Sequence, residues 1–164
     1  MKNLLILTVF LFYCIFLKAQ SLQIQDLSTS IGSWKGKLTY LDYSSGKPYT
    51  MLANIQISLT ENKNGYIMCY EYPKESSANS KDTTYVVEKL FGKDKIVDFK
   101  KDRNNRFRLV TEIVGEDGND HKKAILRHTY ELMSNKYSIK KEVKFEGSEI
   151  WIKRNEYLLK RSGN

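Results

Sequence analysis

The feature that most constrains the fold is a series of short runs in which apolar and polar side chains alternate between turn residues. Successive side chains of a β-strand point to opposite faces, so this alternation predicts antiparallel sheet with one buried face. In the clearest run, ANIQISLT (residues 53–60), the residues Ala53, Ile55, Ile57 and Leu59 face one way. Turn residues cut out about nine such runs, and they stand at Ser45-Gly46, residues 62–65, Gly92, Asn104-Asn105, residues 117–119, Ser134-Asn135 and Gly147.

Helical periodicity is almost absent from the chain, apart from the short segment SLQIQDLSTSI (residues 21–31) before the first run. Consecutive hairpin-linked strands expose two sheet edges unless they close on themselves or form two packed sheets. The sequence therefore predicts one all-β domain, an antiparallel up-and-down β-barrel of about 8 to 10 strands behind a short N-terminal helix. A two-sheet sandwich is the alternative.

The N-terminus is a separate segment. Lys2 precedes an unbroken apolar run at residues 4–17, and the tripeptide KAQ follows at residues 18–20. This pattern is typical of a secretory signal peptide cleaved after its alanine, and the run is shorter than the ~20 residues that span a bilayer as a helix. We therefore expect a signal peptide over residues 1–19 and a barrel domain over residues 20–164. The mature chain should have no transmembrane segment and should lie in the periplasm or outside the cell.

The two cysteines bear on anchoring and on stability. Cys14 raises the alternative of a lipid anchor, but Tyr13 stands where lipoprotein signals place a small residue. After cleavage the chain retains only Cys69, which cannot form an internal disulfide. We therefore expect a packed core to supply the stability.

The charge of the chain is strongly positive. Removal of Lys2 and Lys18 leaves 25 basic residues against 19 acidic ones, and the excess lies in residues 93–164. A solvated hairpin tip is the simpler interpretation of its densest stretch, and a patch for an anionic partner such as lipid headgroups or surface glycans is the alternative. Export argues against a nucleic-acid partner. The basic residues of this stretch, KKDRNNRFR, are Lys100, Lys101, Arg103, Arg106 and Arg108.

The first strand-length run opens with Gly32, Ser33 and Trp34. A Gly-x-Trp triplet that enters the first strand after a short helix resembles the calycin superfamily, which includes lipocalins and fatty-acid-binding proteins. The chain also resembles small exported lipocalin-like proteins of Bacteroidetes-type bacteria. The resemblance implies that Trp34 packs across the closed end of the barrel under a basic side chain from the last strand. Arg161 is the first candidate for that side chain and Arg154 the second.

The chain departs from the calycin pattern in the motifs that accompany ligands. It lacks the Thr-Asp-Tyr turn motif of lipocalins and the Arg-x-Tyr pair with which fatty-acid-binding proteins hold a carboxylate. The resemblance therefore implies the barrel and does not imply a fatty acid as the ligand.

Alternation also predicts which side chains would line a cavity. Tyr66, Met68, Tyr70 and Tyr72 share one face of the run GYIMCYEYP (residues 65–73). Such an aromatic row contacts a ligand in a hollow barrel, and fills the core or lies outside in a packed one.

Two polar residues interrupt rows that are otherwise apolar or aromatic. His128 shares its row with Tyr130, and a hydrogen-bonded core histidine is the simpler interpretation, with a ligand to haem or metal as the alternative. Lys141 shares its row with Ile139 and Val143. An inward lysine indicates an internal acid partner or an anionic ligand, unless its amine reaches the barrel rim.

We therefore expect an exported, monomeric barrel that binds a small apolar or amphiphilic molecule, an anion being one form of it. The alternative is a packed barrel that acts as an interaction or inhibitor module through its basic outer surface. The two histidines, His121 and His128, lack neighbours in metal-ligand spacing, and no serine or cysteine nucleophile is paired with either. We expect no metal, no cofactor and no catalytic residue. The candidate lining residues are Tyr66, Met68, Tyr70, His128, Tyr130 and Lys141.

Overall fold

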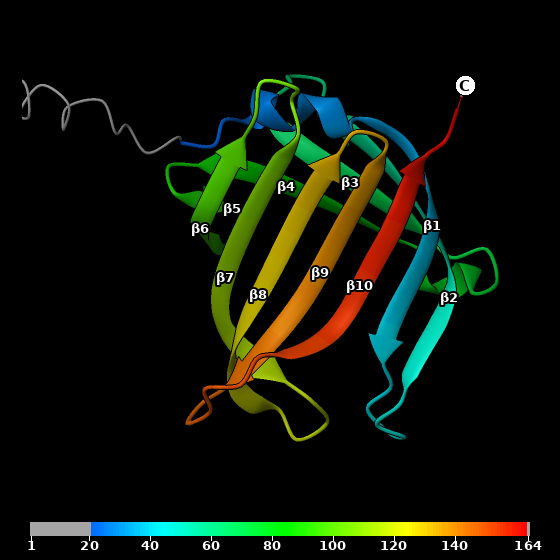
Figure 1. Ribbon diagram of the computed structural model, residues 1–164, viewed down its shortest axis with the longest axis vertical. Coiled ribbons are helices and arrows are strands. Elements are labelled where there is room, and N and C mark those ends of the chain that lie inside the picture. Colours follow the sequence, from blue (N-terminus) through cyan, green and yellow to red (C-terminus); the bar gives the residue numbers. More distant parts are fainter. Residues whose placement is uncertain (1–20, 164) are drawn as a thin grey trace, which may run out of the picture.

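The computed structural model describes residues 21–163. The predicted signal peptide over residues 1–19 and the alternative lipid anchor at Cys14 lie outside these residues. The described chain forms a closed antiparallel barrel with two short 3₁₀ helices (Figure 1), which confirms the predicted fold class. The elements in chain order are η2 (Ile24–Ser30), β1 (Gly32–Leu41), β2 (Pro48–Leu59), β3 (Gly65–Glu71), η3 (Ser76–Ala78), β4 (Ser80–Val87), β5 (Leu90–Phe91), β6 (Asp94–Lys101), β7 (Phe107–Asp117), β8 (Lys122–Met133), β9 (Lys136–Phe145) and β10 (Ile152–Arg161).

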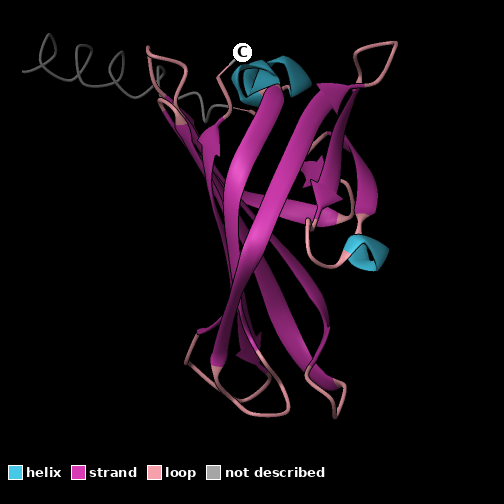
Figure 2. Ribbon diagram, turned by 90° about the vertical axis from the view of Figure 1, so that its right-hand side faces the viewer, coloured by secondary structure: helices cyan, strands magenta, loops and turns pink. Residues whose placement is uncertain are grey.

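The strands run up and down in sequence order, and the first strand pairs with the last. Across the β1–β10 seam Trp34 stands opposite Arg161 and Tyr40 opposite Asn155. Closure of the seam removes the free edges that a flat sheet of this kind would expose. Figure 2 shows the long strands crossing at an angle, as closure of a barrel requires.

The structure has one more strand than the turn residues indicated. Gly92 predicts a single break between two long runs, but the chain turns twice there, at residues 88–89 and at residues 92–93. Glu88 adopts the left-handed region at the first turn, with φ of 54°. Because this turn contains no glycine, proline or asparagine, the two-residue strand β5 between the turns carries no sequence signal.

The short helix η2 lies across one end of the barrel, called here the closed end (Figures 1 and 2). Trp34 is 0% exposed beneath it, and the indole nitrogen donates a hydrogen bond to the carbonyl of Ser30 at 2.7 Å. The guanidinium of Arg161 lies 4.3 Å from the indole ring centroid and donates to the carbonyls of Ile31 and Thr29. The helix, the first strand and the last strand are therefore tied together at this end.

The core fills the closed end of the barrel. Inward side chains of β2 continue the predicted row, with Ala53, Ile55 and Ile57 all buried. Tyr137 packs against the Trp34 ring at a centroid distance of 5.4 Å. No helix of residues 21–163 is long and apolar enough to cross a membrane. The other large buried side chains around this end are Leu22, Leu27, Tyr66, Phe107, Leu109, Leu132 and Leu159.

Candidate functional site

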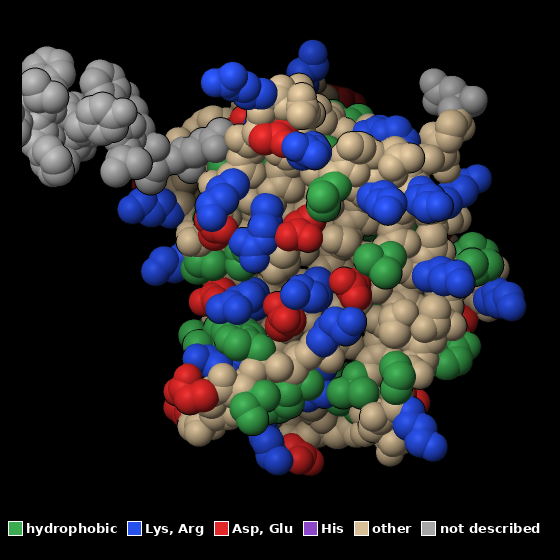
Figure 3. All heavy atoms as spheres, viewed as in Figure 1, with side chains coloured by type: hydrophobic (Ala, Val, Ile, Leu, Met, Phe, Trp, Pro, Cys, Tyr) green, Lys and Arg blue, Asp and Glu red, His purple; other side chains and the backbone are tan. Residues whose placement is uncertain are grey.

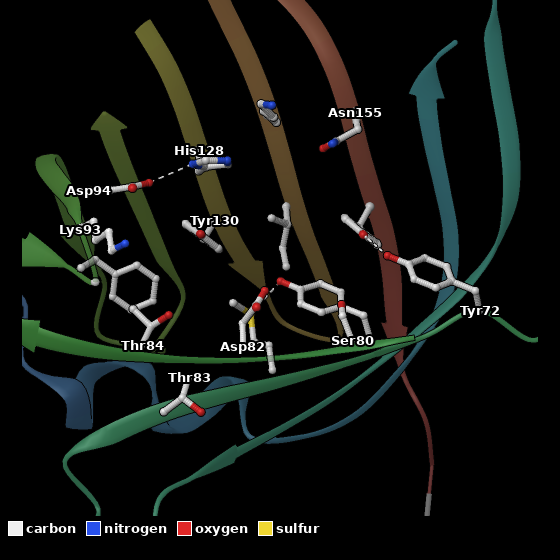
Figure 4. Close-up of a pocket in the computed structure, with 17 residues that line it drawn as sticks. Tyr72, Ser80, Asp82, Thr83, Thr84, Lys93, Asp94, His128, Tyr130 and Asn155 are labelled. Carbon is white, nitrogen blue, oxygen red and sulfur yellow. Dashed lines mark hydrogen bonds and ion pairs between the residues drawn. The ribbon is translucent and has the colours of Figure 1, made fainter. Parts of the chain in front are cut away.

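A cavity of about 510 Å³ lies in the half of the barrel away from η2 (Figure 4). The packed core stops where the inward side chains of β8 to β10 change from apolar to polar. Thr111, His128, Lys141 and Asn155 stand opposite one another across four adjacent strands, at one level of the wall. The cavity is lined by Met68, Tyr70, Tyr72, Ser80, Asp82, Thr83, Thr84, Phe91, Gly92, Lys93, Asp94, His128, Tyr130, Ile139, Lys141, Asn155 and Tyr157.

The cavity opens to solvent where the wall is thinnest. β5 is so short that only residues 86–87 of β4 have a partner on that side, and β6 pairs with β7 only as far as Glu112. Ser80 and Asp82 of β4 and Lys93 of the β5–β6 turn line the cavity here, and all three are exposed. β5 therefore closes the wall only beside residues 86–87 of β4. The cavity opens to solvent beside the part of β4 that has no partner in β5, at Ser80 and Asp82.

Four tyrosines line the cavity, Tyr70 and Tyr72 from β3 and the segment after it, Tyr130 from β8 and Tyr157 from β10. The rings of Tyr70 and Tyr157 lie 5.6 Å apart, and the hydroxyls of Tyr72 and Tyr157 lie 2.6 Å apart. Burial is the main reason why the pKa values of Tyr70, Tyr130 and Tyr157 lie above the usual value for tyrosine. Their hydroxyls stay neutral at ordinary pH, so each keeps a proton to donate while its ring offers an apolar face.

His128 is held by an acid of β6, two strands along the barrel wall. Its Nδ1 lies 2.9 Å from Asp94 Oδ2, and the hydroxyl of Thr111 donates to the same oxygen at 3.0 Å. Burial acts to raise the pKa of Asp94, but the hydrogen bond from His128 and its charge outweigh burial, so that pKa lies below its usual value. With Nδ1 engaged, Nε2 is the ring nitrogen left for a ligand.

Lys141 has an internal acid partner, which is one of the alternatives that its position left open. Its amine donates to Asp117 Oδ1 at 3.0 Å, and Arg154 donates to Asp117 Oδ2 at 2.6 Å. Tyr43 adds a hydrogen bond at 2.9 Å from the β1–β2 turn. The side chain of Asp117 is only 3% exposed. Its charge therefore holds two cations at the far end of the barrel, where the β1–β2, β7–β8 and β9–β10 turns lie.

The structure brings together five of the six candidate lining residues. Met68, Tyr70, His128, Tyr130 and Lys141 line the cavity. The sixth, Tyr66, does not line it.

Tyr66 lies in the packed closed end, 1% exposed, with its hydroxyl 2.6 Å from the hydroxyl of Ser30. Tyr66 precedes Met68 by one inward position on β3. It therefore lies nearer to η2 than the residues of β3 that line the cavity do. Arg154, the second candidate for the tryptophan contact, lies at the opposite end over the ring of Tyr43, at 4.7 Å. Arg161 holds the position over Trp34.

Sequence reasoning missed the acidic side of the cavity. Asp82 belongs to the inward row of β4, in which only the last residue is apolar: Ser80, Asp82, Thr84 and Val86. The opposite row also runs from polar to apolar, from Lys81 to Val87, so alternation does not distinguish the inward face of β4. Asp94 and Asn155 were missed for a related reason, because only the register between strands places them beside His128 and Lys141.

The basic stretch at residues 100–108 forms the β6–β7 hairpin beside η2. Its turn is joined to η2 by a hydrogen bond from the hydroxyl of Thr29 to the carbonyl of Asn105, at 3.1 Å. Lys and Arg side chains alternate with Asp and Glu over the face of the barrel that Figure 3 presents. The paired residues of the stretch are Lys100 with Asp98, Lys101 with Asp26, Arg106 with Asp102, and Arg108 with Asp98 and Glu131.

Among residues 21–163 no group of three or more His, Cys, Asp and Glu side chains is arranged to hold a metal ion. Cys69 is the free cysteine of the described chain and is partly buried. It lies next to Met68, and strand alternation turns it away from the cavity.

The fold and the cavity together define a class of molecule, a closed ten-stranded antiparallel barrel that is packed at one end and hollow at the other. No protein-family model and no curated protein sequence matches the chain. Among solved structures it is similar to the one described as "Crystal Structure of Rv2717c from M. tuberculosis", with a TM-score of 0.59 and 13% sequence identity. The match covers 85% of this chain and 97% of that one. At 13% sequence identity, this similarity is evidence for the fold alone.

Proposed function

We propose that this protein is an exported, lipocalin-like barrel that binds a small amphiphilic molecule in the cavity between β3, β4 and β8 to β10. The observation that carries the proposal is the cavity itself, about 510 Å³ in volume and lined by both tyrosine rings and polar groups. Pockets of this size that join apolar walls to a few converging polar groups are typical of small-molecule sites.

The calycin relationship belongs to the same proposal. A short helix over the barrel end, Trp34 beneath it and Arg161 above the indole ring form the arrangement that the Gly-x-Trp resemblance implies. Export rests on the N-terminal apolar segment of the sequence, residues 4–17.

The alternative is a module that acts through its basic outer surface. It has less support, because most basic side chains of its densest stretch are within ion-pair distance of an acid. Paired charges present a weaker net field to an anionic partner. An anionic surface partner stays a prediction.

Native mass spectrometry of protein purified gently from its natural host tests the binding proposal. We expect a species heavier than the polypeptide by the mass of one small molecule. The variant Ser80→Phe, which places a ring in the cavity, should lose that added mass. The control is Ser58→Phe on the outer face of β2, which should keep it. If both variants and the unaltered protein show only the polypeptide mass, the cavity does not retain a ligand and the outer surface becomes the better account.

A further inference from the structure

Some charged side chains that line the cavity form ion pairs with residues of opposite charge, whereas Asp82 forms none with the residues that the structure describes. Asp94 pairs with His128, and Lys141 pairs with Asp117, which lies beyond the cavity at the far end. The carboxylate of Asp82 makes no hydrogen bond or ion pair with any side chain of residues 21–163. It projects from β4 toward the interior, whereas Thr83 beside it points away (Figure 4).

The surroundings of Asp82 are aromatic. The residue stands opposite Met68 across the β3–β4 ladder, and the rings of Tyr70, Tyr130 and Tyr157 line the cavity with it. Burial is the first cause of the raised pKa values of these three tyrosines, and the negative charge of Asp82 adds to it for each of them. All three rings thus border the same cavity as this one carboxylate.

Such a surrounding favours positive charge. The face of an aromatic ring carries negative potential and attracts a cation, and an unpaired carboxylate adds a full charge to that attraction. Lys93 also lines the cavity, and both it and Asp82 are exposed, but Lys93 lies on the Asp94 side, away from Asp82 (Figure 4). No ion pair joins its ammonium to the Asp82 carboxylate in the part of the chain that the structure describes.

We propose that the cavity selects an organic cation, an amine or quaternary ammonium group held between the Asp82 carboxylate and the rings of Tyr70, Tyr130 and Tyr157. The proposal rests on the binding function proposed above and names the chemistry of its ligand. It replaces the anion expected from Lys141, because that amine is already engaged by the Asp117 carboxylate at 3.0 Å.

Three probes that share one aromatic skeleton test the charge preference: 2-phenylethylamine, 2-phenylethanol and 3-phenylpropionate. Titration calorimetry measures each affinity, and the NMR signal of the Met68 methyl group reports whether the probe enters the cavity. We expect the amine to bind most tightly and the carboxylate most weakly. Asp82→Asn, which keeps the shape and removes the charge, should weaken amine binding by roughly ten- to one-hundredfold and leave the alcohol unchanged.

Asp120→Asn is the matched control. It removes the same charge from the β7–β8 turn, where the side chain is 74% exposed and pairs with Lys122. It should leave all three affinities unchanged. If the alcohol or the carboxylate binds more tightly than the amine while shifting the Met68 signal, the cation preference is wrong and the binding function stands. If no probe shifts that signal, both proposals fail.

Discussion

Trp34 and Arg161 are far apart in the sequence, yet they stabilise the same end of the barrel. The indole is fully buried and bonded to the backbone of η2, and the guanidinium covers it while binding two further backbone carbonyls. Because these contacts join the helix to both strands of the closing seam, the pair acts on stability and does not touch the cavity.

We expect Trp34→Ala to lower the free energy of unfolding by ~3 to 5 kcal/mol, since a large buried side chain is lost and its space is not refilled. Denaturant unfolding measures the change. Trp151→Ala is the control, because Trp151 is only partly buried on the outside of the barrel under the guanidinium of Arg127, 3.7 Å from the ring centroid. It should cost about 1 kcal/mol. Equal costs at the two positions would contradict the assignment of Trp34 to the core.

Asp117 makes stability depend on pH. Burial acts to raise its pKa, but hydrogen bonds from Lys141 and Tyr43 and the charge of Lys141 outweigh burial, so the pKa is lowered from the usual 3.8. A carboxyl group whose pKa is lower in the folded state stabilises the fold at pH values above 3.8, and this contribution is lost as the pH falls through the folded value.

Asp117→Asn should therefore reduce the free energy of unfolding by ~3 kcal/mol near neutral pH, because it leaves the charges of Lys141 and Arg154 uncompensated. The difference from the unaltered protein should shrink as the pH is lowered below about 4. Denaturant unfolding at a series of pH values measures it, with Asp120→Asn as the exposed control. A difference that is constant over the whole series would show that the charge of Asp117 does not act this way.

At the scale of the strands, β1 and β10 leave no room for a side chain at Gly36. A Cβ atom on Gly36 would lie 2.1 Å from the carbonyl oxygen of Leu158 and 2.9 Å from the Cα of Leu159. Both are backbone atoms, which cannot move aside without shifting β10.

Gly36→Ala should therefore destabilise the protein by ~1 to 3 kcal/mol through overpacking at the seam. Gly163→Ala, where the new Cβ meets no atom within 4 Å, should have almost no effect. Thermal unfolding of the two variants compares them directly. If Gly36→Ala left the thermal stability unchanged, β1 and β10 would have to lie farther apart at this position.

The strands also show which features of the structure can be predicted from the sequence and which cannot. Alternation predicted the antiparallel barrel and put Met68 with Tyr70 in one row, and His128, Tyr130 and Lys141 in rows that are otherwise apolar or aromatic. The structure turns these rows toward the cavity. Alternation could not find the acid partner of Lys141, since that contact depends on which residues of distant strands share a level. It also gave no sign of β5, whose preceding turn lacks the usual turn residues.

For the whole molecule, the prediction that matters most concerns the residues before the barrel. If residues 1–19 form a signal peptide, the protein recovered from the periplasm or the medium should begin at Gln20. N-terminal sequencing of that fraction is the measurement. Recovery of an intact Met1, or of a lipid-modified Cys14, would contradict it.

The division of the barrel into a packed end and a hollow end has a consequence for how such a protein changes over time. The inward residues Ser80, Asp82 and Thr84 of β4 lie outside the buried core and line the cavity. Mutations there alter the chemistry presented to a guest molecule at little thermodynamic cost, because the contacts that hold the chain folded lie elsewhere. Related barrels can thus diverge in what they carry while keeping one scaffold, and a directed library confined to this strand is the natural starting point for redesign.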